Sequence, residues 1–248
     1  MTSSSRRTPP PTNRTRSSRL LRTAPERPFL ERHRSKLLWG LAGAALIGVV
    51  AMAFLNATSP AYACSTEWEP APTSAPGPDA TPRLGYVQDD FGQAHVTIGS
   101  FVKYVLCPPA SGKHYNAQSE GPVRPGVYGP DDQATPMGWI HNLEHGGVVV
   151  LYRCADGDTG CSDEAQQANR DLFASFPNSP ICNMPGASTL VVARFDQMAW
   201  PYAALVWGQV LPLESFDAQR IRDFYAQQGE LTNPEPFCPK PTPTPAPA

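Results

Sequence analysis

Two histidines and one glutamate fall within five consecutive positions of this chain: His141, Glu144 and His145. On a helix, side chains four residues apart lie on one side, and on a strand the same spacing also gives a shared face. Either geometry lets the two imidazoles converge on one metal ion, for which imidazole and carboxylate are common ligands. We predict His114, from a preceding loop, as a third imidazole, and zinc or copper as the ion that such ligands favour.

The same residues allow two other interpretations. The pattern His141-x-x-Glu144-His145 matches the inverted zinc-peptidase motif, in which two histidines bind zinc and the carboxylate activates a water molecule. That motif lies inside a long helix, whereas Gly146-Gly147 and an apolar run follow it here. A metal-dependent hydrolase with Glu144 as general base is therefore an alternative to a non-enzymatic metal-binding or interaction module. The other alternative is a purely structural domain without metal, since polar clusters also arise in ordinary ion-pair networks.

Several short apolar runs predict the strands that would position these residues. Residues 148–152 read Val-Val-Val-Leu-Tyr after a glycine pair, which is typical of a strand buried on both faces. Residues 94–98 and 101–105 are predicted strands joined by a two-residue Gly-Ser connection, a hairpin signal. Residues 190–195 and 202–207 give two further strands. The candidate cluster therefore lies where a turn or a helical turn leads into the middle of a sheet.

Two amphipathic segments predict helices. Ser162 is a suitable N-cap for the first, which carries acidic residues in its first turn and stops before Pro177. Ser215 or Asp217 caps the second, which Gly229 closes. Together with the strands, this order predicts an α+β fold, a mostly antiparallel sheet with two helices on one face. The strand-helix-strand-strand-helix ending is also similar to that of a thioredoxin-like domain, although no Cys-x-x-Cys accompanies it.

Composition divides the chain into folded and unfolded parts. The 29 prolines among 248 residues concentrate near the two ends and between residues 60 and 82. Segments rich in Pro, Ala, Thr and Ser bury too little apolar surface to offset chain entropy. We therefore predict a disordered arm at 1–36, a linker at 56–83 and a disordered tail at 239–248. One globular domain at 84–238 remains, a normal size for a single core.

The segment 37–55 predicts a single transmembrane helix that precedes this domain. It has nineteen residues without a charge, and at ~1.5 Å rise per residue it just spans a ~30 Å bilayer core. Ten of the 20 Lys and Arg residues lie in 1–36, beside only two acidic residues. The positive-inside rule then places the N-terminus in the cytoplasm and the domain outside, as a signal anchor. The basic arm is thus an orientation signal, and no nucleic-acid partner is expected.

Signal cleavage is the alternative to an uncleaved anchor. Ala61-Tyr62-Ala63 before Cys64 has the small-x-small form of a signal-peptidase site, so the protein could be secreted after cleavage near Ala63. Lipidation of Cys64 also stays open, although Ala61 stands where a lipoprotein signal usually has leucine.

All six cysteines follow the apolar segment. In an oxidising compartment an even number of cysteines favours disulfides over free thiols. Cys154 and Cys161 bracket a polar, turn-forming loop, and we predict a disulfide between them. No Cys-x-x-Cys spacing supports a zinc knuckle. The remaining four can pair in three ways: Cys64, Cys107, Cys182 and Cys238.

Several motifs occur in a fixed order along the chain. They are Pro-Pro-Ala-Ser-Gly-Lys-His at 108–114, Gly-Val-Tyr at 126–128, His-Asn-Leu-Glu-His-Gly at 141–146, Val-Trp-Gly at 206–208, and Pro-Glu-Pro before a cysteine at 234–238. In kind and order they resemble the bacterial domain-of-unknown-function family 3105. The resemblance covers about residues 85–238.

That family resemblance implies a membrane-anchored or secreted extracytoplasmic domain, and it implies no known activity. Two departures stand out. Members of the family often have a cysteine just before Gly-Val-Tyr, where this chain has Pro125, and Val206 replaces their alanine before Trp-Gly. The missing cysteine leaves Cys107 or Cys182 as the partner of Cys238. We therefore expect a single-pass membrane protein whose disulfide-bonded outer domain is a non-enzymatic metal-binding or interaction module.

Overall fold

The computed structural model describes residues 29–58, 61–70, 83–132, 134–155 and 159–240. The chain divides into two compact units, residues 1–59 and 60–248. The first unit contains helix α1 (Phe29–Thr58), in which His33–Ala51 is long and apolar enough to cross a membrane, a test that a signal sequence also passes. The helix begins before the predicted span, so residues 29–36 of the expected arm are helical. The rest of that arm lies outside the described residues.

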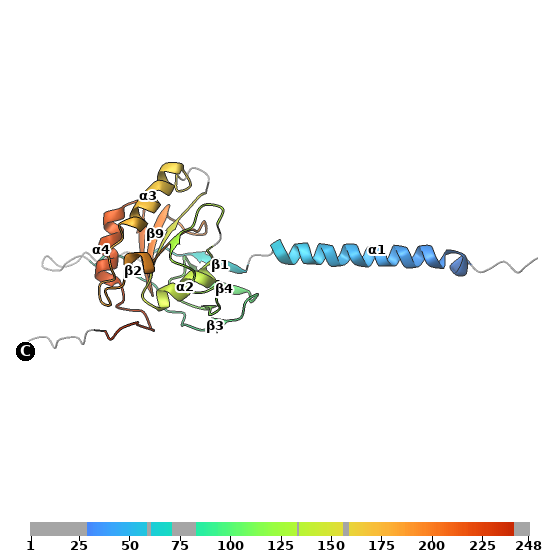
Figure 1. Ribbon diagram of the computed structural model, residues 1–248, viewed down its shortest axis with the longest axis horizontal. Helices are drawn as coiled ribbons and strands as arrows, with labels where there is room; N and C mark the ends of the chain where they lie inside the picture. Colours follow the sequence, from blue (N-terminus) through green and yellow to red (C-terminus); the bar gives the residue numbers. More distant parts are fainter. Residues whose placement is uncertain (1–28, 59–60, 71–82, 133, 156–158, 241–248) are drawn as a thin grey trace, which may run out of the picture. The chain divides into compact units, whose positions relative to one another are not determined.

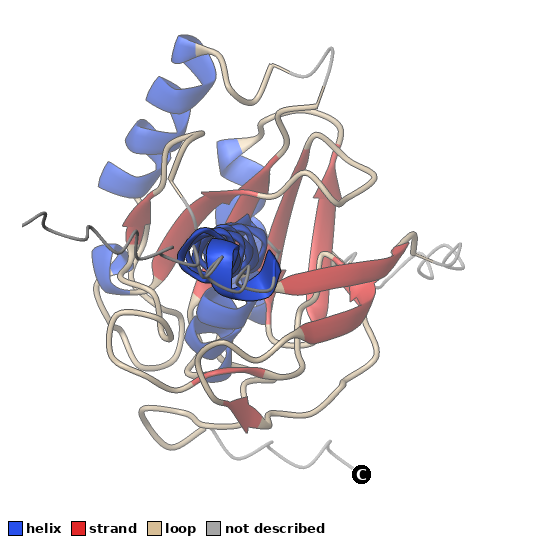
Figure 2. Ribbon diagram, turned by 90° about the vertical axis from the view of Figure 1, so that its right-hand side faces the viewer, coloured by secondary structure: helices blue, strands red, loops and turns tan. Residues whose placement is uncertain are grey.

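A six-stranded mixed sheet forms the centre of the second unit (Figure 2). Its order is β2-β10-β9-β7-β8-β6, with three antiparallel pairings followed by two parallel ones. Strand β7 lies inside the sheet and all its residues are buried, which confirms the strand expected from the Val-rich run. The bounds are β2 Tyr86–Val87, β6 Gly126–Val127, β7 Val148–Tyr152, β8 Leu190–Arg194, β9 Tyr202–Val206 and β10 Gln209–Leu213.

Helices cover both faces of this sheet (Figure 1). Helices α3 (Asp163–Ala174) and α4 (Ala218–Gln228) pack on one face against the side chains of Val148, Val150 and Tyr152. Helix α2 (Pro136–Glu144) packs on the other face, against Val149 and Leu151. The α+β class and the two helices on one face are therefore confirmed, and α2 adds a layer where only a turn or a single helical turn was expected. A short 3-10 helix, η1 (Gly186–Ser188), precedes β8.

The caps of the two predicted helices are also confirmed. The Ser162 hydroxyl accepts a hydrogen bond from the Ala165 N–H, and the Asp217 carboxylate accepts one from the Arg220 N–H. Each side chain satisfies one of the N–H groups that a helix start leaves unpaired.

The hairpin expected across 94–98 and 101–105 does not form. Strand β3 (His95–Val96) pairs in parallel with β5 (His114–Tyr115), while β4 (Val102–Cys107) pairs in parallel with β1 (Tyr62–Glu67). The Gly-Ser turn is present, since the Ser100 N–H donates to the Thr97 carbonyl at 3.0 Å. The two flanking strands nevertheless take partners from distant segments. Neither partner could be identified from a local turn signal.

The segment expected to be a linker, 56–83, contains part of the folded domain. Strand β1 lies within it, and Trp68 follows with a buried side chain and a backbone N–H that donates to the Cys107 carbonyl at 2.8 Å. The compact second unit therefore starts near Pro60 and not at residue 84. Residues 71–82 of the expected linker lie outside the described part of the chain.

Three disulfides join the cysteines. Cys154–Cys161 is confirmed, and the other two are Cys64–Cys107 and Cys182–Cys238. The first of these ties β1 to the end of β4, and the second ties the C-terminal segment to the loop before η1. A disulfide-bonded Cys64 has no thiol to carry a lipid, so lipidation at this residue does not fit the fold.

Candidate metal centre

Helix α2 carries the central part of the site. Pro136 occupies its first turn, where a missing N–H costs nothing. The helix ends at Glu144 because Gly146 adopts a φ of +88°, a left-handed conformation that favours glycine. The N–H groups of Gly146 and Gly147 then donate to the carbonyls of Leu143 and Asn142 at 3.0 and 2.8 Å, a Schellman ending. The glycine pair thus stops the helix directly after the cluster and leads the chain into β7.

Four side chains converge beside this helix end: His95 from β3, His114 from β5, and His141 and Glu144 from α2. Each offers a donor atom within 4.8 Å of those of the other three. The imidazole Nε2 atoms lie 3.4 Å (His95), 3.0 Å (His114) and 3.8 Å (His141) from Glu144 Oε2. The β3–β5 register sets His95 directly against His114. All three imidazoles therefore surround one carboxylate oxygen.

This site is buried on all sides except one. The side chains of His114 and Glu144 are 0% exposed and that of His141 is 5% exposed, whereas that of His95 is 38% exposed. A small ion could therefore reach the cluster past His95.

Hydrogen bonds at Nδ1 fix how two of the imidazoles face the carboxylate. His114 Nδ1 lies 2.8 Å from the Gly112 carbonyl and His141 Nδ1 lies 2.6 Å from the Tyr115 carbonyl. A carbonyl oxygen only accepts, so each Nδ1 carries the proton. In the neutral ring, Nε2 then presents its lone pair toward Glu144. The same carbonyl-backed geometry orients the histidine ligands of protein metal sites.

The cluster contains more acceptors than donors. Burial lowers the pKa of His141, and the nearby His114 and His145 act in the same direction, while its bond to the Tyr115 carbonyl and the charge of Glu144 oppose them. The buried Oε1 of Glu144 has no hydrogen-bond partner among the described residues. A buried carboxylate surrounded by imidazole lone pairs is costly unless a cation balances it. The donor set of three nitrogens and one oxygen fits a divalent transition metal ion.

The ordered loops around the cluster hold these ligands in place. The Tyr104 hydroxyl donates to the Lys113 carbonyl at 2.6 Å, next to His114. The Asn142 side chain accepts from the Val123 N–H at 3.0 Å and donates to the Val123 carbonyl at 2.8 Å, which joins α2 to the loop after β5. The long segment between β5 and α2 therefore supports the site.

The structure brings together three of the four predicted residues, His114, His141 and Glu144. It adds His95, whose only signal in the sequence is its place among the few histidines of the second unit. His145 lies beside this set, with its Nε2 3.1 Å from the Nε2 of His141. It also belongs to a second donor group with Glu144 and Glu235.

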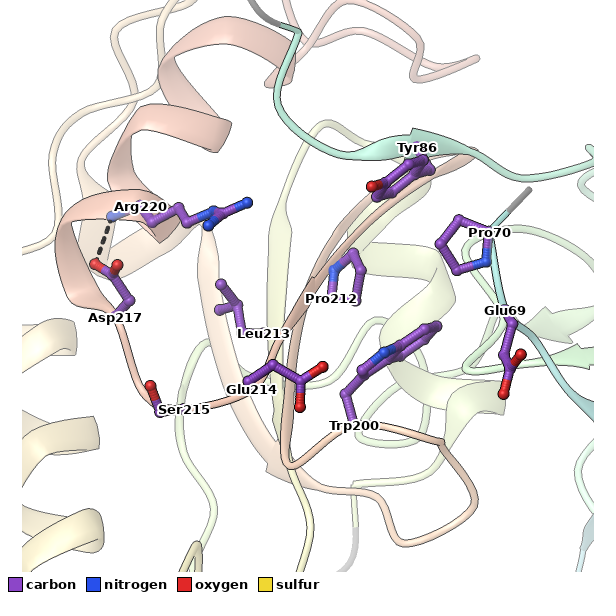
Figure 3. A pocket seen from close by; sticks show the side chains of 10 residues that line it. All are labelled: Glu69, Pro70, Tyr86, Trp200, Pro212, Leu213, Glu214, Ser215, Asp217 and Arg220. Carbon is purple, nitrogen blue, oxygen red and sulfur yellow. Dashed lines mark hydrogen bonds between the residues drawn. The ribbon is translucent and has the colours of Figure 1, made fainter. Parts of the chain in front are cut away.

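A separate pocket of about 480 Å³ lies between β10, the start of α4 and the segment after β1 (Figure 3). Trp200 and Tyr86 line it, together with the carboxylates of Glu69 and Glu214 and the Arg220 side chain. None of its lining residues belongs to the histidine cluster, and its mixed charges indicate no particular chemistry.

Comparison with known proteins gives one match. The model of a family described as protein of unknown function (DUF3105) matches residues 95–241. No curated protein and no solved structure matches the chain. The matched segment contains the four clustered side chains and the Cys182–Cys238 disulfide, and it leaves out β1.

Proposed function

Because the chain belongs to the DUF3105 family, whose function is unknown, we propose its role from the histidine cluster. The outer domain is a metal-binding module that holds one divalent transition metal ion with His95, His114, His141 and Glu144. Zinc and copper are the ions that three imidazoles and a carboxylate favour. The role is binding and not catalysis.

One observation carries this proposal, namely the orientation of the buried imidazoles. The carbonyls of Gly112 and Tyr115 take the Nδ1 protons of His114 and His141, at 2.8 and 2.6 Å. Two Nε2 lone pairs then point at a carboxylate oxygen that is itself 3.0 and 3.8 Å away. A cluster held by hydrogen bonds alone would instead require doubly protonated imidazoles, which donate from Nε2 to the carboxylate as well as from Nδ1 to the carbonyls. A metal ion satisfies the two Nε2 lone pairs and the carboxylate at once.

The ligand count favours a non-enzymatic site over a hydrolase. Structural zinc sites use four protein ligands, whereas catalytic ones keep a position for water. Glu144 lies among the imidazoles, within 3.0 to 3.8 Å of each of the three Nε2 atoms, where it is a ligand and not a separate base. The helix also ends at Glu144, unlike the long helix of the inverted zinc-peptidase motif.

The location that fits this proposal is outside the cytoplasmic membrane, on a single-pass anchor with a cytoplasmic N-terminus. The apolar helix α1 and the three disulfides support it. Cleavage after Ala63 is the alternative. That peptide bond lies inside β1, whose ladder with β4 includes both Tyr62 and Cys64, so an intact strand favours the anchor.

The test is the metal content of the full-length protein, purified without a histidine tag from membranes of an oxidising compartment. We expect at least one zinc or copper per chain after dialysis, measured by plasma mass spectrometry. His95→Ala and His114→Ala should each lower the content by about one ion, while His33→Ala, in the first unit, should not. Because His95 is partly exposed, its variant should keep the wild-type circular dichroism. No metal after loading, or an unchanged content in His95→Ala and His114→Ala, would refute the proposal.

A further inference from the structure

A second donor group adjoins the first at the C-terminal end of α2. Glu144, His145 and Glu235 each offer a ligand atom within 4.8 Å of the others. His145 Nε2 lies 3.9 Å from Glu235 Oε2, and the two side chains are 26% and 49% exposed. Glu144 belongs to both groups, so the two lie side by side.

The His145 imidazole is oriented as a ligand would be. Its Nδ1 lies 3.3 Å from the Glu235 carbonyl, which only accepts, so Nε2 presents a lone pair. That Nε2 lies 3.1 Å from Nε2 of His141, whose own proton goes to the Tyr115 carbonyl. Two acceptor nitrogens face each other at this distance. Phe237 stacks on the His145 ring, with centroids 5.2 Å apart and planes at 29°, and this contact restricts the orientation of the imidazole.

Glu235 reaches the site on a segment that is firmly attached, residues 230–240, which we call the C-terminal strap. The Glu235 N–H donates to the Glu144 carbonyl at 3.2 Å, which sets the strap against the end of α2. Further along, Cys238 forms the disulfide with Cys182. Lys240 Nζ donates to the carbonyls of Leu231 and Asn233 at 3.0 and 2.6 Å.

The other end of the strap is attached equally well. Glu230 is buried, and its Oε2 accepts from the N–H groups of Ile181 and Cys182 at 2.7 and 3.0 Å. The strap is thus bonded to the same loop through Glu230 and through the disulfide. Glu235 is therefore not a free surface carboxylate that happens to lie near a histidine.

We propose that Glu144 bridges two cations. Its Oε2 faces the three inner imidazoles, and its Oε1, buried and without a partner among the described residues, serves a second divalent transition metal ion held by His145 and Glu235. This inference rests on the proposed function, because Glu144 is shared. Paired metal ions in proteins lie ~3.5–4 Å apart, a spacing that one carboxylate spans.

The outer ion differs from the inner one in its surroundings. It has three protein ligands, two of them on partly exposed side chains, so water completes its coordination. An ion held in this way exchanges faster than the enclosed inner ion and is removed first by a chelator. The two positions should therefore fill and empty in sequence.

The test is the zinc stoichiometry of the full-length protein in detergent micelles, stripped of metal and dialysed against micromolar free Zn²⁺. We expect two ions per chain in the wild type and one in Glu235→Gln and in His145→Ala. Glu214→Gln, which removes an exposed carboxylate from the separate pocket of Figure 3, is the control and should keep two. With Cu²⁺, the wild type should show the weakened paramagnetic signal of a coupled pair, and Glu235→Gln the full signal of one isolated ion.

The outcomes separate the two proposals. One ion in the wild type and in Glu235→Gln alike would refute the outer position and leave the inner site intact. Two ions in both would show that the second ion binds elsewhere. No ion in any of the proteins would overturn the inner site as well.

Discussion

Removal of the Cys64–Cys107 disulfide should destabilise the second unit strongly. In the chain-entropy description, a disulfide stabilises a protein by restricting its unfolded state, by an amount that grows with the loop it closes. This bond joins residues 43 apart in the sequence, for which the relation gives about 4 kcal/mol at 25 °C. A domain with a total stability of about 5–15 kcal/mol would lose a large part of it. The double variant Cys64→Ser/Cys107→Ser tests this expectation.

The Cys154–Cys161 bond is the matched control, because it joins residues only 7 apart. The same relation gives about 2.4 kcal/mol for Cys154→Ser/Cys161→Ser. Urea unfolding of residues 60–248, followed by circular dichroism under oxidising conditions, compares the two double variants. For a domain of this size, the larger loss corresponds to a melting temperature roughly 8–16 °C lower.

The decisive result is which of the two double variants loses more free energy of unfolding. If Cys64→Ser/Cys107→Ser loses no more than the control variant, β1 is not part of the cooperative unit. The domain boundary near Pro60 would then be wrong, and a boundary near residue 84 would be restored. A loss of about 4 kcal/mol would instead mean that fragments lacking Cys64 are unsuitable for studies of the metal site.

Three further outcomes are expected. Gly138→Ala should lower stability by ~1–3 kcal/mol, although alanine favours helices, because its Cβ would lie 2.5 Å from both the Glu120 carbonyl oxygen and Val123 Cγ1; a melting temperature at or above wild type would contradict this packing. Asn142→Ala should cost about 2 kcal/mol or more in urea unfolding, since it leaves the buried Val123 N–H and carbonyl unpaired; a loss under 0.5 kcal/mol would refute it. Zinc at 100 times its dissociation constant should stabilise the wild type by ~2.7 kcal/mol in thermal unfolding, and His95→Ala should remove this gain in stability. An equal gain in the wild type and in His95→Ala would show that zinc binds elsewhere.

Patterns within short segments of the sequence were sufficient to predict several of the helices and strands. The run at 148–152, the caps at Ser162 and Asp217 and the uncharged span in α1 each lie within one short segment. Strand β10 was missed because Pro212 reads as a strand breaker. In the structure Pro212 lies beyond the two residues of β10 that pair with β2, so no ladder bond on that side needs its missing N–H.

The site was predictable from spacing where its residues share one element, whereas His114, on β5, was predicted from its residue type alone. His141 and Glu144 lie three apart on α2, so helical spacing alone brings them together. His95 comes from β3, whose two-residue parallel pairing with β5 has no turn or periodicity to reveal it. His145 follows the last residue of α2, where the chain turns at Gly146, and this places it on the side of the strap and not among the inner imidazoles.

One inner ligand, His95, lies on a strand that is much less buried than the elements that carry the other three. His141 and Glu144 are joined by three residues to β7, the fully buried strand inside the sheet, whereas His95 and His114 lie on a separate two-stranded pair. Segments with few buried contacts open far more often than the core does. For the proposed inner ion, the rate of release is then set by the opening of β3, whose His95 side chain is 38% exposed, while the buried β5 and α2 stay folded. The affinity of the site for the ion and the rate at which the ion leaves are governed by different segments. Substitutions in β3 can therefore change the residence time of the ion without altering the ligands that α2 presents.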